Sequence, residues 1–197
     1  MANLDPSRQL ATYADYLRWE DGRFEIVDGI VFAMSPAPNR AHQRVTVELA
    51  RQVANFLVGK SCELFTAPFD VRLSEIEEAE DDEILNVVQP DLAVVCDPGK
   101  LDDQGCRGAP DWVVEVLSPA TAGRDHVLKR ELYERFGVRE YWLIHPLDRL
   151  LTRYQRGANG RFGPAAINEA QGRTAVAIFP GLEIDWDLVF SRFPASL

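Results

Sequence analysis

The chain has 197 residues and a formal charge of −10, and 46% of its residues are hydrophobic. This length and composition suit a domain with a real core and exclude an intrinsically disordered protein. There is no apolar run of about 18 residues, so no membrane span is expected, and the N-terminus lacks the pattern of a signal peptide. The net acidity argues against a free-standing nucleic-acid binder, whose surface is normally basic.

Much of the negative charge belongs to one segment, residues 75–83, which carries seven acidic residues and no basic ones. The rest of the chain has 24 acidic and 21 basic residues, so its surface could still hold a basic patch. A charge run of this kind is more often a solvated loop than a binding element, and we predict a loop.

The three cysteines, Cys62, Cys96 and Cys106, are an odd number and show no CxxC spacing. This pattern argues against a disulfide framework and against a structural zinc site. It favours a reducing environment, and we expect a cytoplasmic protein.

The first part of the chain predicts helices and hairpin strands. Residues 8–19 predict a short helix, and residues 23–34 predict a hairpin around an Asp-Gly turn. Asn39 suits the N-cap of a helix over residues 41–57. Residues 62–73 predict an extended segment bent at a proline. The apolar stripe of the long helix consists of Val45, Leu49, Val53, Phe56 and Leu57, with His42 also on it.

The second part predicts strands that alternate with one helix. Residues 87–95 and 110–118 predict apolar strands, separated by a loop over residues 97–109. Residues 123–136 predict a helix that ends at Gly137. Further strands are expected over residues 139–145, 150–154, 165–168 and 175–178, and a strand with a short helix over 181–190. The natural interpretation is one α/β domain over residues 1–197, with a mixed sheet flanked by helices and extra antiparallel strands.

Glu115 lies within the strand over residues 110–118, which is apolar on both faces, as in a strand covered on both sides. An ionised carboxylate in such a place costs several kcal/mol unless a cation, a metal or a proton offsets it. At about 100° per residue, Asp125 and Lys129 share the helix stripe of Leu128 and Leu132 that faces the sheet. The alternatives are a salt bridge among Asp125, Lys129 and Glu115, or a lysine that extends to solvent.

Asp91 near the start of another apolar strand is a second anomaly. By itself it could cap or end that strand. Together with Glu115 on a neighbouring strand it makes a pair of carboxylates, which repel each other unless a divalent cation lies between them. Magnesium suits such an all-oxygen site.

Other polar residues rank lower. His42 is more often a satisfied core residue than a phosphate contact, and Asp70 is expected either as a further ligand or as an exposed residue. Glu25 and Glu48 are weaker candidates still. His126 and His145 have no partner spacing for a zinc site.

Several ordered motifs resemble a known family. PDLAVV at residues 90–95, PDWVVEVLSPAT at 110–121 and GVREYWLIHP at 137–146 are similar to the Uma-type family of restriction-endonuclease-like proteins, within the PD-(D/E)XK nuclease superfamily. FEIVDGIVFAMSP at 24–36 also fits, so the resemblance covers roughly residues 10–185. It implies a restriction-endonuclease-like mixed sheet flanked by helices and metal-dependent hydrolysis of DNA.

The resemblance also implies roles for individual residues. Asp91 and Glu115 would hold Mg²⁺ or Mn²⁺, and Lys129 would orient water or stabilise charge, positioned by Asp125. The superfamily lysine usually stands two residues after the glutamate, where this chain has Leu117. A homodimer could present a basic groove and supply two sites. The alternatives are a catalytically silent nuclease-fold module for binding or assembly, and a hydrolase of another phosphate ester.

Overall fold

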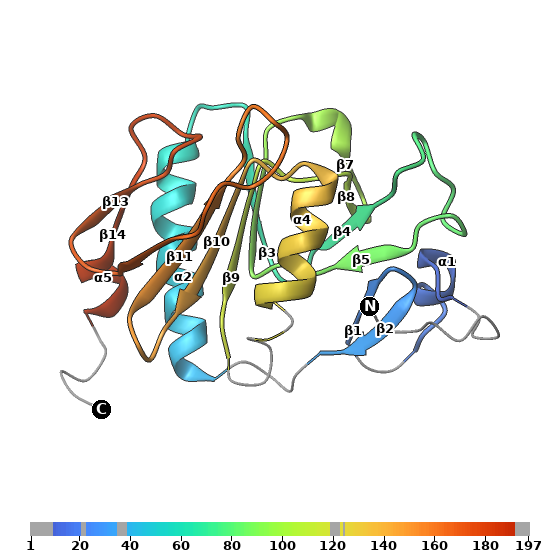
Figure 1. Ribbon diagram of the computed structural model, residues 1–197, viewed down its shortest axis with the longest axis horizontal. Coiled ribbons are helices and arrows are strands. Elements are labelled where there is room, and N and C mark those ends of the chain that lie inside the picture. The colour runs from blue at the N-terminus through green and yellow to red at the C-terminus, as the bar shows by residue number, and fades with distance from the viewer. Residues whose placement is uncertain (1–9, 21–22, 35–38, 119–122, 124, 192–197) are drawn as a thin grey trace.

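Two large sheets with helices packed against them make up the fold (Figure 1). The computed structural model describes residues 10–20, 23–34, 39–118, 123 and 125–191. Within these ranges the strands form two six-stranded sheets and one two-stranded sheet. The mixed α/β class with flanking helices and extra antiparallel strands is confirmed, although the strands divide into two large sheets rather than one.

The first sheet has the order β2-β1-β5-β4-β8-β7, in which only β4 and β8 are parallel neighbours. The predicted hairpin supplies β1 and β2. Its turn residues Asp28 and Gly29 have φ values of 50° and 73°, the left-handed conformation that a tight hairpin turn requires. The bounds are β1 Phe24–Val27, β2 Ile30–Ala33, β4 Asp70–Leu73, β5 Asn86–Val88, β7 Leu101–Asp102 and β8 Gly105–Arg107.

The second sheet has the order β12-β11-β10-β9-β6-β3, in which β9 and β10 are parallel and the other neighbours antiparallel. Its bounds are β3 Glu63–Thr66, β6 Leu92–Val95, β9 Trp112–Val116, β10 Glu140–His145, β11 Leu150–Gln155 and β12 Ala166–Glu169. A small antiparallel pair follows, with β13 at Arg173–Ala175 and β14 at Glu183–Asp185.

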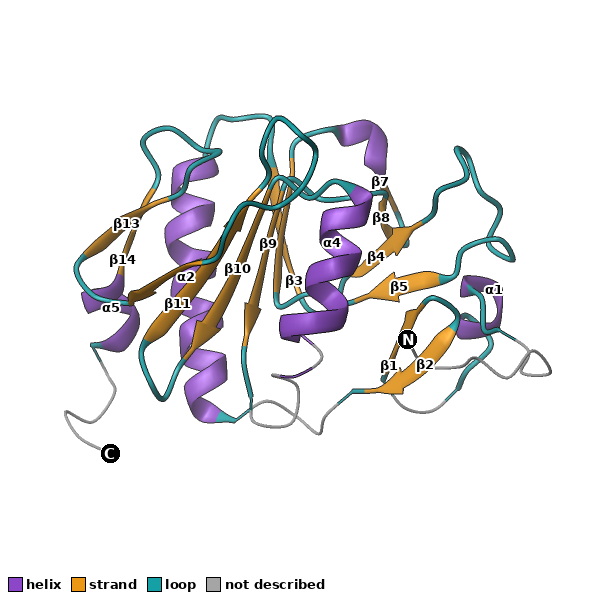
Figure 2. Cartoon of the chain, in the orientation of Figure 1, coloured by secondary structure: helices purple, strands orange, loops and turns teal. Residues whose placement is uncertain are grey.

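Helices cover both faces of the second sheet (Figure 2). The long helix α2 (Arg40–Leu57) packs on one face, and α4 (Arg130–Phe136) packs on the other. Asn39 caps α2 as predicted, because its side chain accepts a hydrogen bond from the His42 backbone N–H at 2.9 Å. None of the helices in the described ranges is long and apolar enough to cross a membrane. The short helices are α1 (Tyr13–Tyr16), α5 (Trp186–Phe190) and a 3₁₀ turn at Pro98–Lys100.

Strand β9 divides the core into two layers by simple alternation. Trp112, Val114 and Val116 pack with α2, whereas Val113 packs with the side chains of α4. Glu115 belongs to the same alternation as Val113, so its carboxylate is directed toward the α4 side, where the two large sheets also meet.

Three segments differ from the sequence predictions. The strand expected over residues 175–178 lies earlier, as β13 at Arg173–Ala175. The expected strand over residues 87–95 is in fact two strands, β5 and β6, which belong to different sheets. Pro90 between them has no N–H to donate, so a continuous ladder is interrupted there. The expected loop over residues 97–109 contains the short strands β7 and β8.

The N-terminal helix is also shorter than expected. Only four residues, Tyr13–Tyr16, are helical, because Thr12 and Asp15 form a capping box that starts the helix late. Residues 8 and 9 of that prediction lie outside the described part of the chain. The acidic segment over residues 75–83 forms the predicted loop between β4 and β5.

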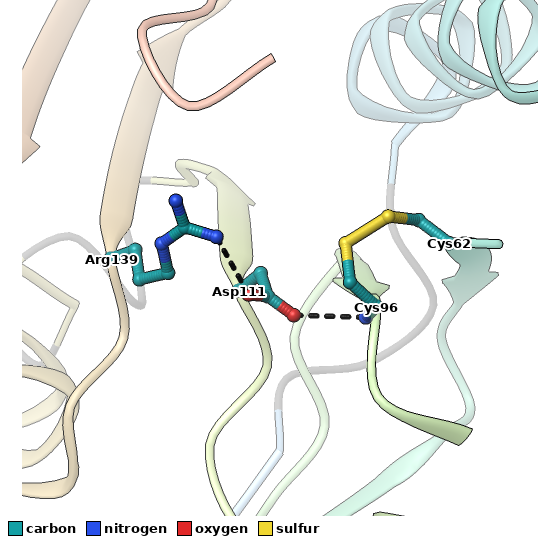
Figure 3. Close-up of a disulfide and its surroundings, with 4 residues drawn as sticks. All are labelled: Cys62, Cys96, Asp111 and Arg139. Atoms are coloured by element: carbon teal, nitrogen blue, oxygen red, sulfur yellow. Dashed lines mark hydrogen bonds and ion pairs between the residues drawn. A yellow bond between two sulfur atoms is a disulfide. The ribbon is translucent and has the colours of Figure 1, made fainter. Parts of the chain in front are cut away.

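The cysteine count misled the sequence analysis. Cys62 and Cys96 form a disulfide (Figure 3), and Cys106 is a buried free thiol. The antiparallel pairing of β3 with β6 places Glu63 opposite Val95, so the cysteines next to them face each other. Asp111 joins this corner by accepting hydrogen bonds from the Cys96 backbone N–H at 2.8 Å and from Arg139 at 3.1 Å. The prediction of no disulfide was therefore wrong, because an odd number of cysteines does not exclude one disulfide between residues 34 positions apart.

Candidate active site

Glu115 is the centre of a buried charged cluster on the α4 side of the second sheet. It is only 4% exposed. Its Oε1 atom accepts hydrogen bonds from Lys129 Nζ at 2.8 Å and from the Tyr133 hydroxyl at 3.1 Å. The predicted compensating cation is thus Lys129, which satisfies the requirement that a buried carboxylate be paired and hydrogen-bonded.

Lys129 reaches the cluster from an unusual turn of helix. Asp125–Lys129 is a π-helix, here η2, that leads into α4. Lys129 is 3% exposed, as its place on the inward stripe predicted, but Leu128 is 37% exposed and does not face the sheet. The reason is that a π-helical turn uses a different periodicity from the 3.6 residues assumed for an α-helix. Single-turn π segments are frequent at functional sites.

Glu25 is the member of the cluster that the sequence analysis undervalued. Its Oε1 atom lies 2.8 Å from Lys129 Nζ, and its side chain is 2% exposed. The same oxygen accepts a hydrogen bond from the backbone N–H of Gln89 at 3.0 Å. The sequence held a signal, since Glu25 stands among the apolar residues of β1 as Glu115 does in β9. Lys129 therefore bridges two carboxylates, one from each large sheet.

Asp91 lies just before β6 and next to the end of β9. The register pairs Leu92 with Val114, which brings Asp91 level with Glu115. Its Oδ2 atom accepts the backbone N–H of Val116 at 2.7 Å and lies 3.0 Å from His42 Nε2. Asp91 therefore ends the strand ladder, as the alternative interpretation allowed, and is also held beside the glutamate strand by α2.

Asp70 is connected to the buried cluster through Gln89. It accepts hydrogen bonds from Gln89 Nε2 at 2.7 Å and from the Tyr16 hydroxyl at 3.1 Å. Burial, together with the charge of Asp70, raises the pKa of Tyr16 above its ordinary value, so the phenol stays a hydrogen-bond donor. Gln89 thus links Asp70 to Glu25 through its side chain and its backbone. Sequence reasoning gave no role to Gln89, because its neighbours come from distant segments.

Two carboxylates of the site, those of Asp91 and Glu115, are the kind of ligand that a hard divalent cation prefers. Magnesium is usually held by one or two carboxylates, with waters and substrate phosphate completing the shell. Asp91 and Glu115, level on adjacent strands, suit that mode. Among the described side chains no three His, Cys, Asp or Glu residues are grouped for a metal. The side chain of Asp125, the predicted positioning residue, lies outside the described part of the structure.

A mixed sheet with flanking helices thus carries buried acids beside a lysine. The structure resembles the crystal structure of a putative nuclease belonging to DUF820 from Anabaena variabilis, with a TM-score of 0.71 and 16% sequence identity. The likeness covers 91% of this chain and 97% of that one. At this identity it shows a common fold.

The sequence gives the family. Residues 13–187 match the Uma2 family model, described as putative restriction endonucleases, and the chain belongs to that family. An uncharacterized protein of Synechocystis, slr1290, is 27% identical over 150 residues, which is 74% of each chain. The family confirms the resemblance seen in the sequence motifs and supports a nuclease-type function.

Proposed function

We propose that this protein is a divalent-metal-dependent endonuclease that hydrolyses phosphodiester bonds of DNA. The observation that carries the proposal is the buried Lys129, held at 2.8 Å from both Glu115 and Glu25. Two acids on adjacent strands would hold the metal ion that assists phosphodiester hydrolysis, and a nearby lysine would stabilise the negative charge that develops. Membership of the Uma2 family supports the same assignment.

Asp91 and Glu115 would hold Mg²⁺ or Mn²⁺, with waters completing the shell. When bound, such an ion supplies charge neutralisation at the phosphoryl group and a more acidic water. Asp91 is prepared for this role because the Val116 backbone N–H and His42 fix the position of its carboxylate. His42 is thus a positioning residue that acts through Asp91.

Lys129 is the proposed catalytic cation. A preorganised ammonium in a dry site stabilises the negative charge that develops on the phosphoryl oxygens more strongly than it would in water. Glu25 and Tyr133 hold this geometry, Glu25 by contact with the ammonium and Tyr133 through Glu115. Asp70 supports Glu25 through Gln89, and Asp125 is proposed to position Lys129.

Basic residues on α2 support a DNA substrate. Arg40 and Arg44, on the N-terminal half of α2 beside His42, line an open groove between α2 and α5. The acidic segment over residues 75–83, the loop between β4 and β5, lies at the right-hand end of the molecule, whereas α2 lies in its left half (Figure 1). The net negative charge therefore does not prevent phosphate contacts on the α2 side.

Cleavage of supercoiled plasmid with Mg²⁺ or Mn²⁺ tests the proposal. Glu115→Gln and Lys129→Met are expected to lower the rate by about 100-fold or more, since each removes a group that acts on the transition state. Glu131→Gln is the matched control, because this acid is exposed on α4. Circular dichroism of each variant separates lost folding from lost chemistry.

The products and the controls distinguish the remaining possibilities. We propose a homodimer, in which two sites cut both strands, so linear plasmid should appear along with nicked circles. Light scattering measures the mass of the protein and so tests for the dimer. Equal cleavage by the wild type and Glu115→Gln would mean a contaminating nuclease and would refute the proposal. DNA binding without cleavage under every metal would favour the catalytically silent module instead.

A further inference from the structure

Two histidines from separate elements meet beside the candidate active site. His145 is the last residue of β10, and His126 lies on η2, three residues before Lys129. Their Nε2 atoms are 3.3 Å apart. The ring centroids are farther apart, at 5.3 Å, so each ring turns its Nε2 corner toward the other. The two histidines have no zinc-ligand spacing in the sequence, because they come together only through the packing of η2 on β10.

A direct hydrogen bond is one way to make this contact, because one ring can donate its Nε2–H to the Nε2 atom of the other when their tautomers differ. At 3.3 Å such a bond is a long one, since nitrogen donors usually lie about 2.7–3.2 Å from an oxygen acceptor. An acceptor oxygen shared by both rings at about 2.9 Å from each would subtend an N–O–N angle of only about 69° at the observed 3.3 Å separation.

A metal ion fits the same separation well. With zinc–nitrogen bonds of about 2.05 Å, one ion bound to both Nε2 atoms has an N–metal–N angle of about 107° at the observed 3.3 Å. That angle is close to tetrahedral. Neutral imidazole is a preferred ligand of zinc, nickel and copper, whereas magnesium prefers oxygen.

We propose that His126 and His145 chelate one divalent transition-metal ion of the zinc class, at a site separate from the carboxylates Asp91 and Glu115. Two protein ligands leave the remaining coordination positions to water, so the site is an open one. The ion would tie η2 to the end of β10 and so stabilise the turn that delivers Lys129 to Glu115. This inference does not depend on the proposed nuclease activity.

The surroundings suit neutral ligands. Both histidines are half-buried. Burial, together with the charge of His126, lowers the pKa of His145, while Asp148 opposes the shift. A histidine must be neutral to bind a metal, so a lowered pKa keeps this ligand available near neutral pH. Other soft ligands compete little, because Cys62 and Cys96 are joined in a disulfide and the Cys106 thiol is buried.

The chain offers its own control, since it has only three histidines. The experiment is titration of the chelator-treated full-length protein with Zn²⁺, in excess Mg²⁺ to fill carboxylate sites, followed by calorimetry and by ¹⁵N NMR of the imidazoles. We expect one ion per chain and Zn²⁺-dependent shifts of the Nε2 signals of His126 and His145, with His42 unchanged. His126→Gln and His145→Gln should each weaken binding by about tenfold or more, because each removes one of two chelating atoms and even the loss of a group that only orients a ligand costs about 10–100-fold.

Other results would overturn the site. Zn²⁺ affinity that survives both substitutions, or imidazole shifts confined to His42, would refute it. If a variant failed to fold, the NMR shifts of the wild-type protein would still decide. Because no step measures DNA cleavage, failure here and failure of the proposed nuclease activity are distinguishable.

Discussion

Replacing Lys129 by methionine tests the most unusual feature of the structure, a buried cation shared by two carboxylates. Lys129, Glu25 and Glu115 are each no more than 4% exposed, and Nζ lies 2.8 Å from an oxygen of each acid. Methionine keeps most of the side-chain volume but takes the ammonium away from both carboxylates. Removing one partner of a buried ion pair costs about 3–5 kcal/mol, so we expect a loss of that size in the free energy of unfolding.

Urea unfolding followed by tryptophan fluorescence measures this loss. The matched control is Arg130→Met at the next position, where the arginine is 29% exposed and pairs with Glu134 at 3.4 Å. A partly exposed pair is worth about 0–1 kcal/mol. If Lys129→Met costs no more than Arg130→Met, the cluster is not energetically coupled and the reasoning fails.

A second variant isolates the charge. In the double variant Lys129→Met with Glu115→Gln, one of the two carboxylates that lost the ammonium is made neutral. We expect the double variant to be more stable than the sum of the two single losses predicts, with a coupling of about 1–3 kcal/mol. Strict additivity would mean that the two side chains act independently.

Two further predictions concern other parts of the core. Burial raises the pKa of Glu140, although hydrogen bonds from Trp142 and the Ile178 backbone oppose it. The folded state then holds its proton to higher pH than the unfolded state, so stability should fall as pH rises above about 4.3, the unfolded pKa. Glu140→Gln should remove this fall, as measured by urea unfolding across mildly acidic pH. The disulfide between Cys62 and Cys96, 34 residues apart, should contribute about 4 kcal/mol to the free energy of unfolding, which reductant or Cys62→Ser removes.

The Glu140 prediction and the disulfide prediction can each be contradicted by a specific result. Parallel pH curves for the wild type and Glu140→Gln would show that another group carries the pH dependence. Wild-type stability that is the same with and without reductant would contradict the disulfide prediction. For Cys62→Ser, the expected loss appears only under oxidising conditions, so equal losses in reductant would point to packing instead.

The candidate site shows how far sequence reasoning reaches. Glu115 and Lys129 were found because a charge in a doubly apolar strand and a lysine on an inward helix stripe are visible in a short window. The same test identifies Glu25, but its partner Gln89 is 64 residues away. Their contact depends on how the first sheet packs against the second, which no local pattern encodes.

Local chemistry thus determined the hairpin around Asp28, the capped helix α2, the strands β9 and β10 and the inward placement of Lys129. These follow from periodicity, capping and turn preferences, which act within a few residues. Only the tertiary structure decided that residues 87–95 divide between two sheets, that two of three cysteines are bonded and that two histidines meet. Such features depend on strand register and on the packing of elements, and those are set by the whole core at once.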